Sequence, residues 1–132
     1  VVGIIAVAIV PISSVALIVA GIVVMNMMLV SVTERTRETG IRKSLGARNR
    51  DIFAEILFES TILTVLGGAA GIFISYAGAI ALGRAFDTAV SISPVYVLMA
   101  LAITTAIGIG AGFFPAYIAS RMSPVEALRY ET

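Results

Sequence analysis

Three long stretches of this chain contain no charged residue, and they constrain its fold more than any other feature. They cover residues 1–33, 60–83 and 88–120. A helix needs about 20 consecutive, mostly apolar residues to cross the hydrocarbon core of a bilayer, and each stretch meets that length. The chain is 59% hydrophobic and 13% charged, which leaves too few polar residues to cover three such helices in water. The sequence therefore predicts an all-α membrane protein with three transmembrane helices.

The expected spans are shorter than the uncharged stretches. As one helix, the first stretch would be on the order of 50 Å long, which exceeds a bilayer. Its Pro-Ile-Ser-Ser sequence at residues 11–14 is expected to interrupt it. Ser93 and Pro94 suit the N-cap and the first position of the last helix. We predict spans at about residues 13–32, 56–83 and 94–119.

Lys and Arg residues are distributed unevenly between the connecting segments. The tail, residues 120–132, carries Arg121 and Arg129. The connection between the last two spans carries only Arg84. The loop between the first two spans, residues 33–51, carries Arg35, Arg37, Arg42, Lys43, Arg48 and Arg50. Because basic loops stay on the cytoplasmic side, we expect this loop and the tail to be cytoplasmic. The orientation, and a start inside an apolar run without Met, predict the C-terminal part of a longer multi-pass protein.

The charged loop has the pattern of a short helix lying along the membrane surface. Glu38 and Arg42 are four residues apart, in the order that favours an ion pair on a helix. Ile41 and Leu45 form an apolar patch at the same spacing. Gly40 costs such a helix about 1 kcal/mol relative to Ala, so we expect it to mark a bend or a close contact.

The ends of this helix and its neighbour on the next span are also predicted. Gly46 is placed to end the loop helix, and Asn49 is expected to cap the next one, with Asp51 in its first turn. With Glu55 and Glu59, Asp51 forms an acidic stripe at four-residue spacing. We expect this stripe to pair with the basic face of the loop helix.

Two interpretations of the loop helix remain open from the residue pattern. Its basic residues would favour an interfacial helix held by anionic lipid headgroups. Its organised charges and apolar patch fit equally well a coupling element, a rigid lever that a cytoplasmic partner grips. Periodicity alone does not separate the two.

Small residues at four-residue spacing predict where the spans contact each other or another protomer, because membrane helices associate by close backbone approach. Both static packing within one subunit and a sliding or dimerising surface fit the pattern. Pro115 removes one backbone donor from the last span and can kink it. The small residues are Gly67, Gly71, Ser75, Ala79 and Gly83 in the second span, and Ala102, Ala106, Gly108, Gly110, Gly112 and Ala116 in the third.

Several kinds of site are excluded by residue types that the chain lacks. It has no Cys and no His, which excludes disulfides, thiolate metal sites and the usual acid–base group near neutral pH. The spans carry no ionisable residue at mid-depth, which argues against an ion or proton pathway in this part of the protein. A net charge of +1 gives no nucleic-acid footprint. We expect no catalytic residue, metal or cofactor in this chain.

Two long motifs resemble one known family. Residues 25–47 read Met-Asn-Met-Met-Leu-Val-Ser-Val-Thr-Glu-Arg-Thr-Arg-Glu-Thr-Gly-Ile-Arg-Lys-Ser-Leu-Gly-Ala, and residues 115–131 begin with Pro-Ala and end with Ser-Pro-Val-Glu-Ala-Leu-Arg-Tyr-Glu. Both resemble MacB-type ABC transporter permeases of the FtsX-like permease family, and the resemblance covers nearly the whole chain. Thr39, Tyr117 and Ile118 depart from the family pattern, the last two where basic residues are frequent.

The resemblance implies a fragment of a permease transmembrane domain whose spans are the second, third and fourth of four. It implies an extracytoplasmic domain, a second protomer, and ATP-binding domains, fused or separate, that hold ATP and Mg. The protein would lie in the bacterial cytoplasmic (inner) membrane. This chain has no Walker motif, so the chemistry of ATP would belong to the ATP-binding partner. The residues that the resemblance assigns to ATPase coupling are Glu34, Arg37, Glu38, Gly40, Ile41, Arg42, Lys43, Leu45, Gly46, Ala47 and Arg48.

The function that the resemblance implies is mechanotransmission. Closure of the ATP-binding domains on the loop helix would be transmitted to the extracytoplasmic domain, for export or extrusion of a drug, peptide or lipoprotein. The alternative is an ATPase-driven signalling permease that regulates an extracellular partner such as a cell-wall hydrolase. A third possibility is a membrane-anchoring bundle with a lipid-bound loop. The extracytoplasmic domain separates the first two, and the loop separates the third from both.

Overall fold

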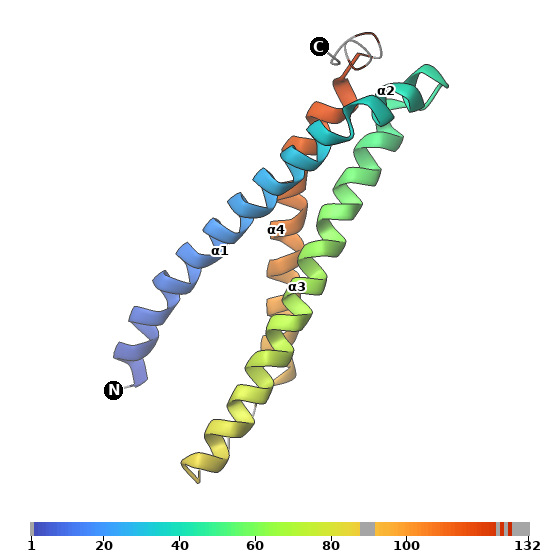
Figure 1. Ribbon diagram of the computed structural model, residues 1–132. Helices are drawn as coiled ribbons and strands as arrows, with labels where there is room; N and C mark the ends of the chain where they lie inside the picture. The colour runs from blue at the N-terminus through green and yellow to red at the C-terminus, as the bar shows by residue number, and fades with distance from the viewer. Residues whose placement is uncertain (1, 88–91, 124, 126, 128–132) are drawn as a thin grey trace.

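The computed structural model describes residues 2–87, 92–123, 125 and 127 (Figure 1). Within them the chain forms helices and no strand, as the sequence predicts. The helices are α1 (Val2–Glu34), α2 (Thr36–Ser44), α3 (Asn49–Ala85) and α4 (Pro94–Arg121). The three long helices are apolar and long enough to cross a membrane. Each predicted span, 13–32, 56–83 and 94–119, falls within one of them.

The long helices converge at the end that carries α2, and α1 diverges from α3 and α4 toward the other end (Figure 1). α4 packs against α3 along most of its length, while α1 contacts α4 and touches α3 only near α2. Buried residues accordingly concentrate at the converging end, where Val32, Ile52 and Ala119 form an apolar core from three different helices. The fold therefore gives α2 a rigid base made of all three long helices.

Close approach of α3 and α4 depends on small residues. A Cβ atom added at Gly108 would collide with Thr64, and one added at Gly112 would collide with Ser60. Ser60 is fully buried, and its hydroxyl donates a hydrogen bond to the Gly108 carbonyl at 3.1 Å. Pro115 is fully buried one turn beyond this contact. The structure thus places Gly108 and Gly112 of α4 against hydroxyl side chains of α3.

The small-residue row of α3 faces a different way. A Cβ atom added at Gly67 or Gly71 would meet no atom within 4 Å, and Ser75 is exposed. The contact with α4 is made instead by Ser60 and Thr64, on another row of the same helix. Among the described residues, Gly67 and Gly71 therefore do not carry the close contact with α4.

The expected interruption of the first span at residues 11–14 is wrong. α1 continues through Pro11 as one helix of 33 residues. Proline removes only one backbone donor, and membrane helices tolerate it because the helix on either side keeps its own hydrogen bonds. Nearby, the Ser14 hydroxyl donates to the Val10 carbonyl at 2.8 Å. A helix of this length spans a bilayer only with tilt or with part of it outside the hydrocarbon core.

The sequence also predicts a short helix in the tail, from Pro124 to about Tyr130, with Ser123 as its cap, and most of this segment lies outside the described residues. Of that segment the structure describes Val125 and Ala127, and the Ala127 N–H donates to the Ser123 carbonyl at 3.0 Å. The remaining tail positions, Arg129 among them, lie outside the described part of the chain.

Candidate functional site

The junction between α1 and α3, residues 34–59, holds most of the charged residues of the chain, and we call it the charged junction. It opens with a tight change of direction at Arg35, after which α2 begins. The Thr36 hydroxyl is buried beside the end of α1 and donates to the carbonyls of Val32 at 3.1 Å and Thr33 at 2.8 Å. Buried hydroxyl groups need such partners. These two hydrogen bonds tie the first residue of α2 directly to the last turn of α1.

α2 ends as the sequence predicts. Leu45 is the C-cap, and its N–H donates a hydrogen bond to the Ile41 carbonyl. The next residue, Gly46, has a φ of 98°. The N–H groups of Gly46 and Ala47 donate to the carbonyls of Lys43 and Arg42, both at 3.0 Å. A left-handed residue with these bonds satisfies the last carbonyls of a helix, and glycine adopts that conformation without steric cost.

The start of α3 differs from the prediction in its cap. Arg48, not Asn49, is the N-cap, and Asn49 is the first helical residue. The Asp51 carboxylate reaches back and accepts a hydrogen bond from the Arg48 N–H at 3.3 Å. An acidic residue at the third helical position can serve this way. Asp51 is therefore engaged at the start of its own helix, whereas the two other acids of the predicted stripe are directed at basic residues of the junction.

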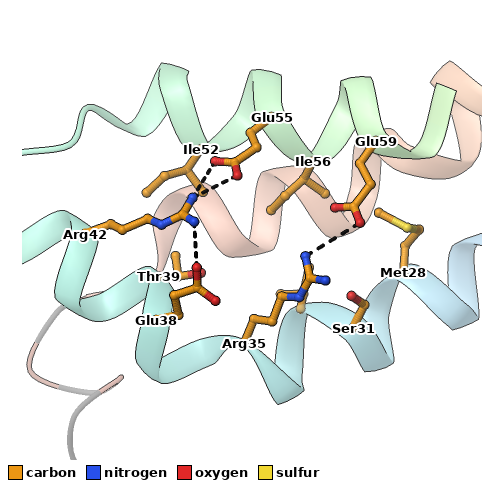
Figure 2. Close-up of a pocket in the computed structure, with 11 residues that line it drawn as sticks. Met28, Ser31, Arg35, Glu38, Thr39, Arg42, Ile52, Glu55, Ile56 and Glu59 are labelled. Carbon is orange, nitrogen blue, oxygen red and sulfur yellow. Dashed lines mark hydrogen bonds and ion pairs between the residues drawn. The ribbon is translucent and has the colours of Figure 1, made fainter. Parts of the chain in front are cut away.

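Arg42 is the centre of an ion-pair cluster (Figure 2). Its guanidinium donates to the Glu55 carboxylate at 2.8 Å and to Glu38 at 2.6 Å. The hydrogen bond to Glu55, then the charges of both carboxylates, raise the pKa of Arg42 above its usual value. Nearby, Arg35 lies 3.6 Å from Glu59. The predicted pairing of the acidic stripe is confirmed for Glu55 and Glu59, and it fixes α2 against α3.

Lys43 makes the connection to α4 that the sequence did not indicate. Its ammonium group donates to the backbone carbonyls of Ser120 at 2.6 Å and Met122 at 2.7 Å. Carbonyls at a helix C-terminus are left without helical partners and attract a cation. Partial burial lowers the pKa of Lys43 below 10.5 by desolvation. A contact between residues so far apart in the chain leaves no periodic signal in the sequence.

The cavity beneath the cluster is too small for a substrate. It has a volume of about 40 Å³ and is lined by residues of α1, α2 and α3 (Figure 2). Ligand pockets usually have roughly 300 Å³ or more. The ion-pair cluster is therefore built for positioning α2 rather than for enclosing a molecule.

The remaining predicted residues of the junction divide into covered and outward positions. Gly40 is buried, and Ala47 is half-buried on the apolar core. Ile41 is 43% exposed and Leu45 is 83% exposed, so the apolar patch that they form faces outward. The other outward positions are the charged side chains of Glu34, Arg37 and Arg48.

Comparison with known proteins matches residues 10–124 to the FtsX-like permease C-terminal family. The chain is 42% identical over 120 residues to "Macrolide export ATP-binding/permease protein MacB" of Rhodopirellula baltica, covering 91% of this chain and 18% of that protein. It is 48% identical over 120 residues to "Uncharacterized ABC transporter permease YknZ" of Bacillus subtilis, covering 91% and 30%. A MacB protein of Neisseria meningitidis is 43% identical over 118 residues, covering 89% and 18%.

The chain spans less than a third of the length of each of these curated relatives. The family match nevertheless includes all three long helices, α2 and the residues that brace it. Together with three helices apolar and long enough to cross a bilayer, this makes the chain part of a membrane-embedded protein. The chain belongs to the FtsX-like permease family.

Proposed function

We propose that the charged junction couples an ABC ATP-binding domain to the membrane helices of a permease. The names of the relatives support the assignment, because they describe ATP-binding/permease proteins and an ABC transporter permease. In this proposal the junction and tail are cytoplasmic, in the bacterial inner membrane, and the partner holds ATP and Mg. Two protomers and an extracytoplasmic domain complete the machine, which exports or extrudes a drug, peptide or lipoprotein.

The observation that carries the proposal is the bracing of α2 on every long helix. α1 runs into it through the buried Thr36, Arg42 holds it to α3, and Lys43 holds it to the end of α4. A force applied to α2 would therefore move all three helices together. The cavity beneath it encloses no substrate, so force transmission explains this geometry better than a binding role does.

The outward patch supplies the surface that a partner would hold. Ile41 and Leu45 are exposed four residues apart, on α2 and at its C-cap, and this apolar pair on an otherwise charged element is the surface that we propose the partner covers. A lipid-bound helix is the competing explanation. It would need the patch, which runs from Ile41 within α2 to Leu45 at its C-cap, to point into the bilayer.

The test compares Leu45→Asp with Leu45→Met in the full-length protein and its ATP-binding domains. We expect Leu45→Asp to insert in the membrane normally but to lose substrate-stimulated ATPase activity and transport by about tenfold, a cost of roughly 1.4 kcal/mol that burying one unpaired carboxylate readily exceeds. Leu45→Met keeps the apolar volume and should retain both activities. Unchanged coupling in Leu45→Asp would rule out gripping at this patch.

A further inference from the structure

A second feature of the converging end is an open groove between the start of α3 and the end of α4. It has a volume of about 380 Å³ and lies apart from the ion-pair cluster. Its walls contain two arginines, one from each helix, and two aromatic rings. The lining residues are Asn49, Arg50, Phe53, Tyr117, Ser120 and Arg121.

The two arginines give the groove positive charge that this part of the chain does not neutralise. Arg50 and Arg121 are exposed, and neither forms an ion pair with a carboxylate of the described residues. The Arg121 guanidinium lies over the Tyr117 ring, 5.1 Å from its centroid. The electrostatic attraction between the cation and the ring face holds the guanidinium near Tyr117, and the guanidinium keeps N–H donors for a further partner. Such a planar donor set matches the oxygens of a phosphate.

An aromatic strip leads from the groove toward the apolar part of the helices. Phe53 lies at the groove and packs edge-to-face on Phe113, with ring centroids 5.4 Å apart. Phe113 is 54% exposed and Tyr117 is 44% exposed. They stand one helical turn apart on α4, with Arg121 one turn further on. The order along the helix surface is therefore apolar ring, phenol, then cation, which is the order of polarity from a bilayer core to its headgroups.

We propose that this groove binds the headgroup of an anionic phospholipid. Its phosphate oxygens accept hydrogen bonds from Arg50 and Arg121, and its acyl chain lies along Phe53 and Phe113. A protein segment arriving from the aqueous side would satisfy the arginines but leave the Phe113 strip uncovered, so a lipid fits the whole surface better. Only the identification of the leaflet as cytoplasmic rests on the proposed function.

Native mass spectrometry of the full-length protein in detergent tests the site, with phosphatidylglycerol and phosphatidylcholine as probes. We expect the wild-type protein to retain phosphatidylglycerol in preference to phosphatidylcholine. Each arginine near anionic lipid contributes about fivefold, so Arg50→Gln with Arg121→Gln should lower phosphatidylglycerol retention at least tenfold. The double lysine variant keeps both charges and should keep most of the preference. Arg84→Gln, at the opposite end of α3, is the matched control and should change nothing.

Three outcomes would overturn the proposal. One is equal phosphatidylglycerol retention by the wild type and the double glutamine variant. Another is displacement of the lipid by inorganic phosphate alone, which would indicate a free-anion site. The last concerns the ATP-binding partner. If the double glutamine variant loses this partner in phosphatidylcholine nanodiscs, while its phosphatidylglycerol retention in detergent is unchanged, the groove is a protein contact. Leu45→Asp separates this site from the coupling function, because it should lose coupling and keep phosphatidylglycerol.

Discussion

Arg42 contributes geometry to the charged junction more than stability. Its two ion pairs lie at the surface, with side-chain exposures of 48% for Arg42 and 57% for Glu55, and exposed ion pairs contribute little to stability because water screens them. What the pairs define is the angle between α2 and α3. A charged residue of α2 can therefore affect coupling in two ways, by holding this angle or by touching the partner directly.

A charge exchange at the residue scale separates these two roles. Arg42→Glu should impair coupling, because it removes both pairs and places a carboxylate beside Glu38 and Glu55. Arg42→Glu with Glu55→Arg restores the link between α2 and α3, and we expect it to recover a large part of the lost ATPase stimulation. The measurement is substrate-stimulated ATPase activity of the full-length protein with its ATP-binding domains. Absence of recovery, with normal membrane insertion, would mean that Arg42 acts on the partner itself.

Lys43 shows where residue-level prediction stops. The sequence predicts its place on the short helix but not its hydrogen bonds to Ser120 and Met122. The i,i+4 pair of Glu38 and Arg42 is local and follows from helix geometry. The Lys43 contact depends on where α4 ends in space, and a single sequence holds no periodic record of that. Lys43, which the resemblance assigns to ATPase coupling, thus also holds α2 against the end of α4.

At the scale of the elements, the sequence predicts existence and type better than contacts. The long helices follow from uncharged length, and the end of α2 follows from Gly46. The prediction fails at Pro11, because the loss of one backbone donor does not end a membrane helix whose other hydrogen bonds are kept. Four-residue spacing identifies a row of small side chains on one face of a helix. Gly67 of α3 and Gly112 of α4 both belong to such rows. Only the structure shows that α4 packs on α3 through the second of these rows.

The packing of α3 on α4 gives a prediction with a built-in control two residues away. Gly112→Val would push a side chain into Ser60, and overpacking of this kind costs about 1–3 kcal/mol. A Cβ atom added at Gly110 meets nothing within 4 Å, so Gly110→Val carries the same change in helix propensity without the collision. We expect thermal unfolding in detergent to occur at a lower temperature for Gly112→Val alone. Equal destabilisation by both variants would show that another element covers the Gly110 face.

At the scale of the whole molecule, the chain is stabilised at one end and open at the other. The apolar core and all the ion pairs among described residues lie at the converging end. Away from it, large apolar side chains are exposed, among them Val7 and Phe73 at 75% each. Lipid or further protein must cover such a surface. This asymmetry fits the proposed function, in which the converging end receives the force and the long helices transmit it.

The direction of that force depends on which side of the membrane the charged junction occupies, and labelling with a thiol reagent that does not cross membranes decides it. This part of the protein has no Cys, so single cysteines introduced here report their own positions once any cysteine elsewhere in the full-length protein has been replaced. Ser44→Cys lies at the exposed end of α2, and Ser93→Cys lies exposed at the start of α4, at the other end of the bundle. The basic residues around α2 predict that Ser44→Cys reacts only after the cells are permeabilised, whereas Ser93→Cys reacts in intact cells. The reverse pattern would place the junction beyond the reach of cytoplasmic ATP, and a nucleotide-driven lever could not then operate from it.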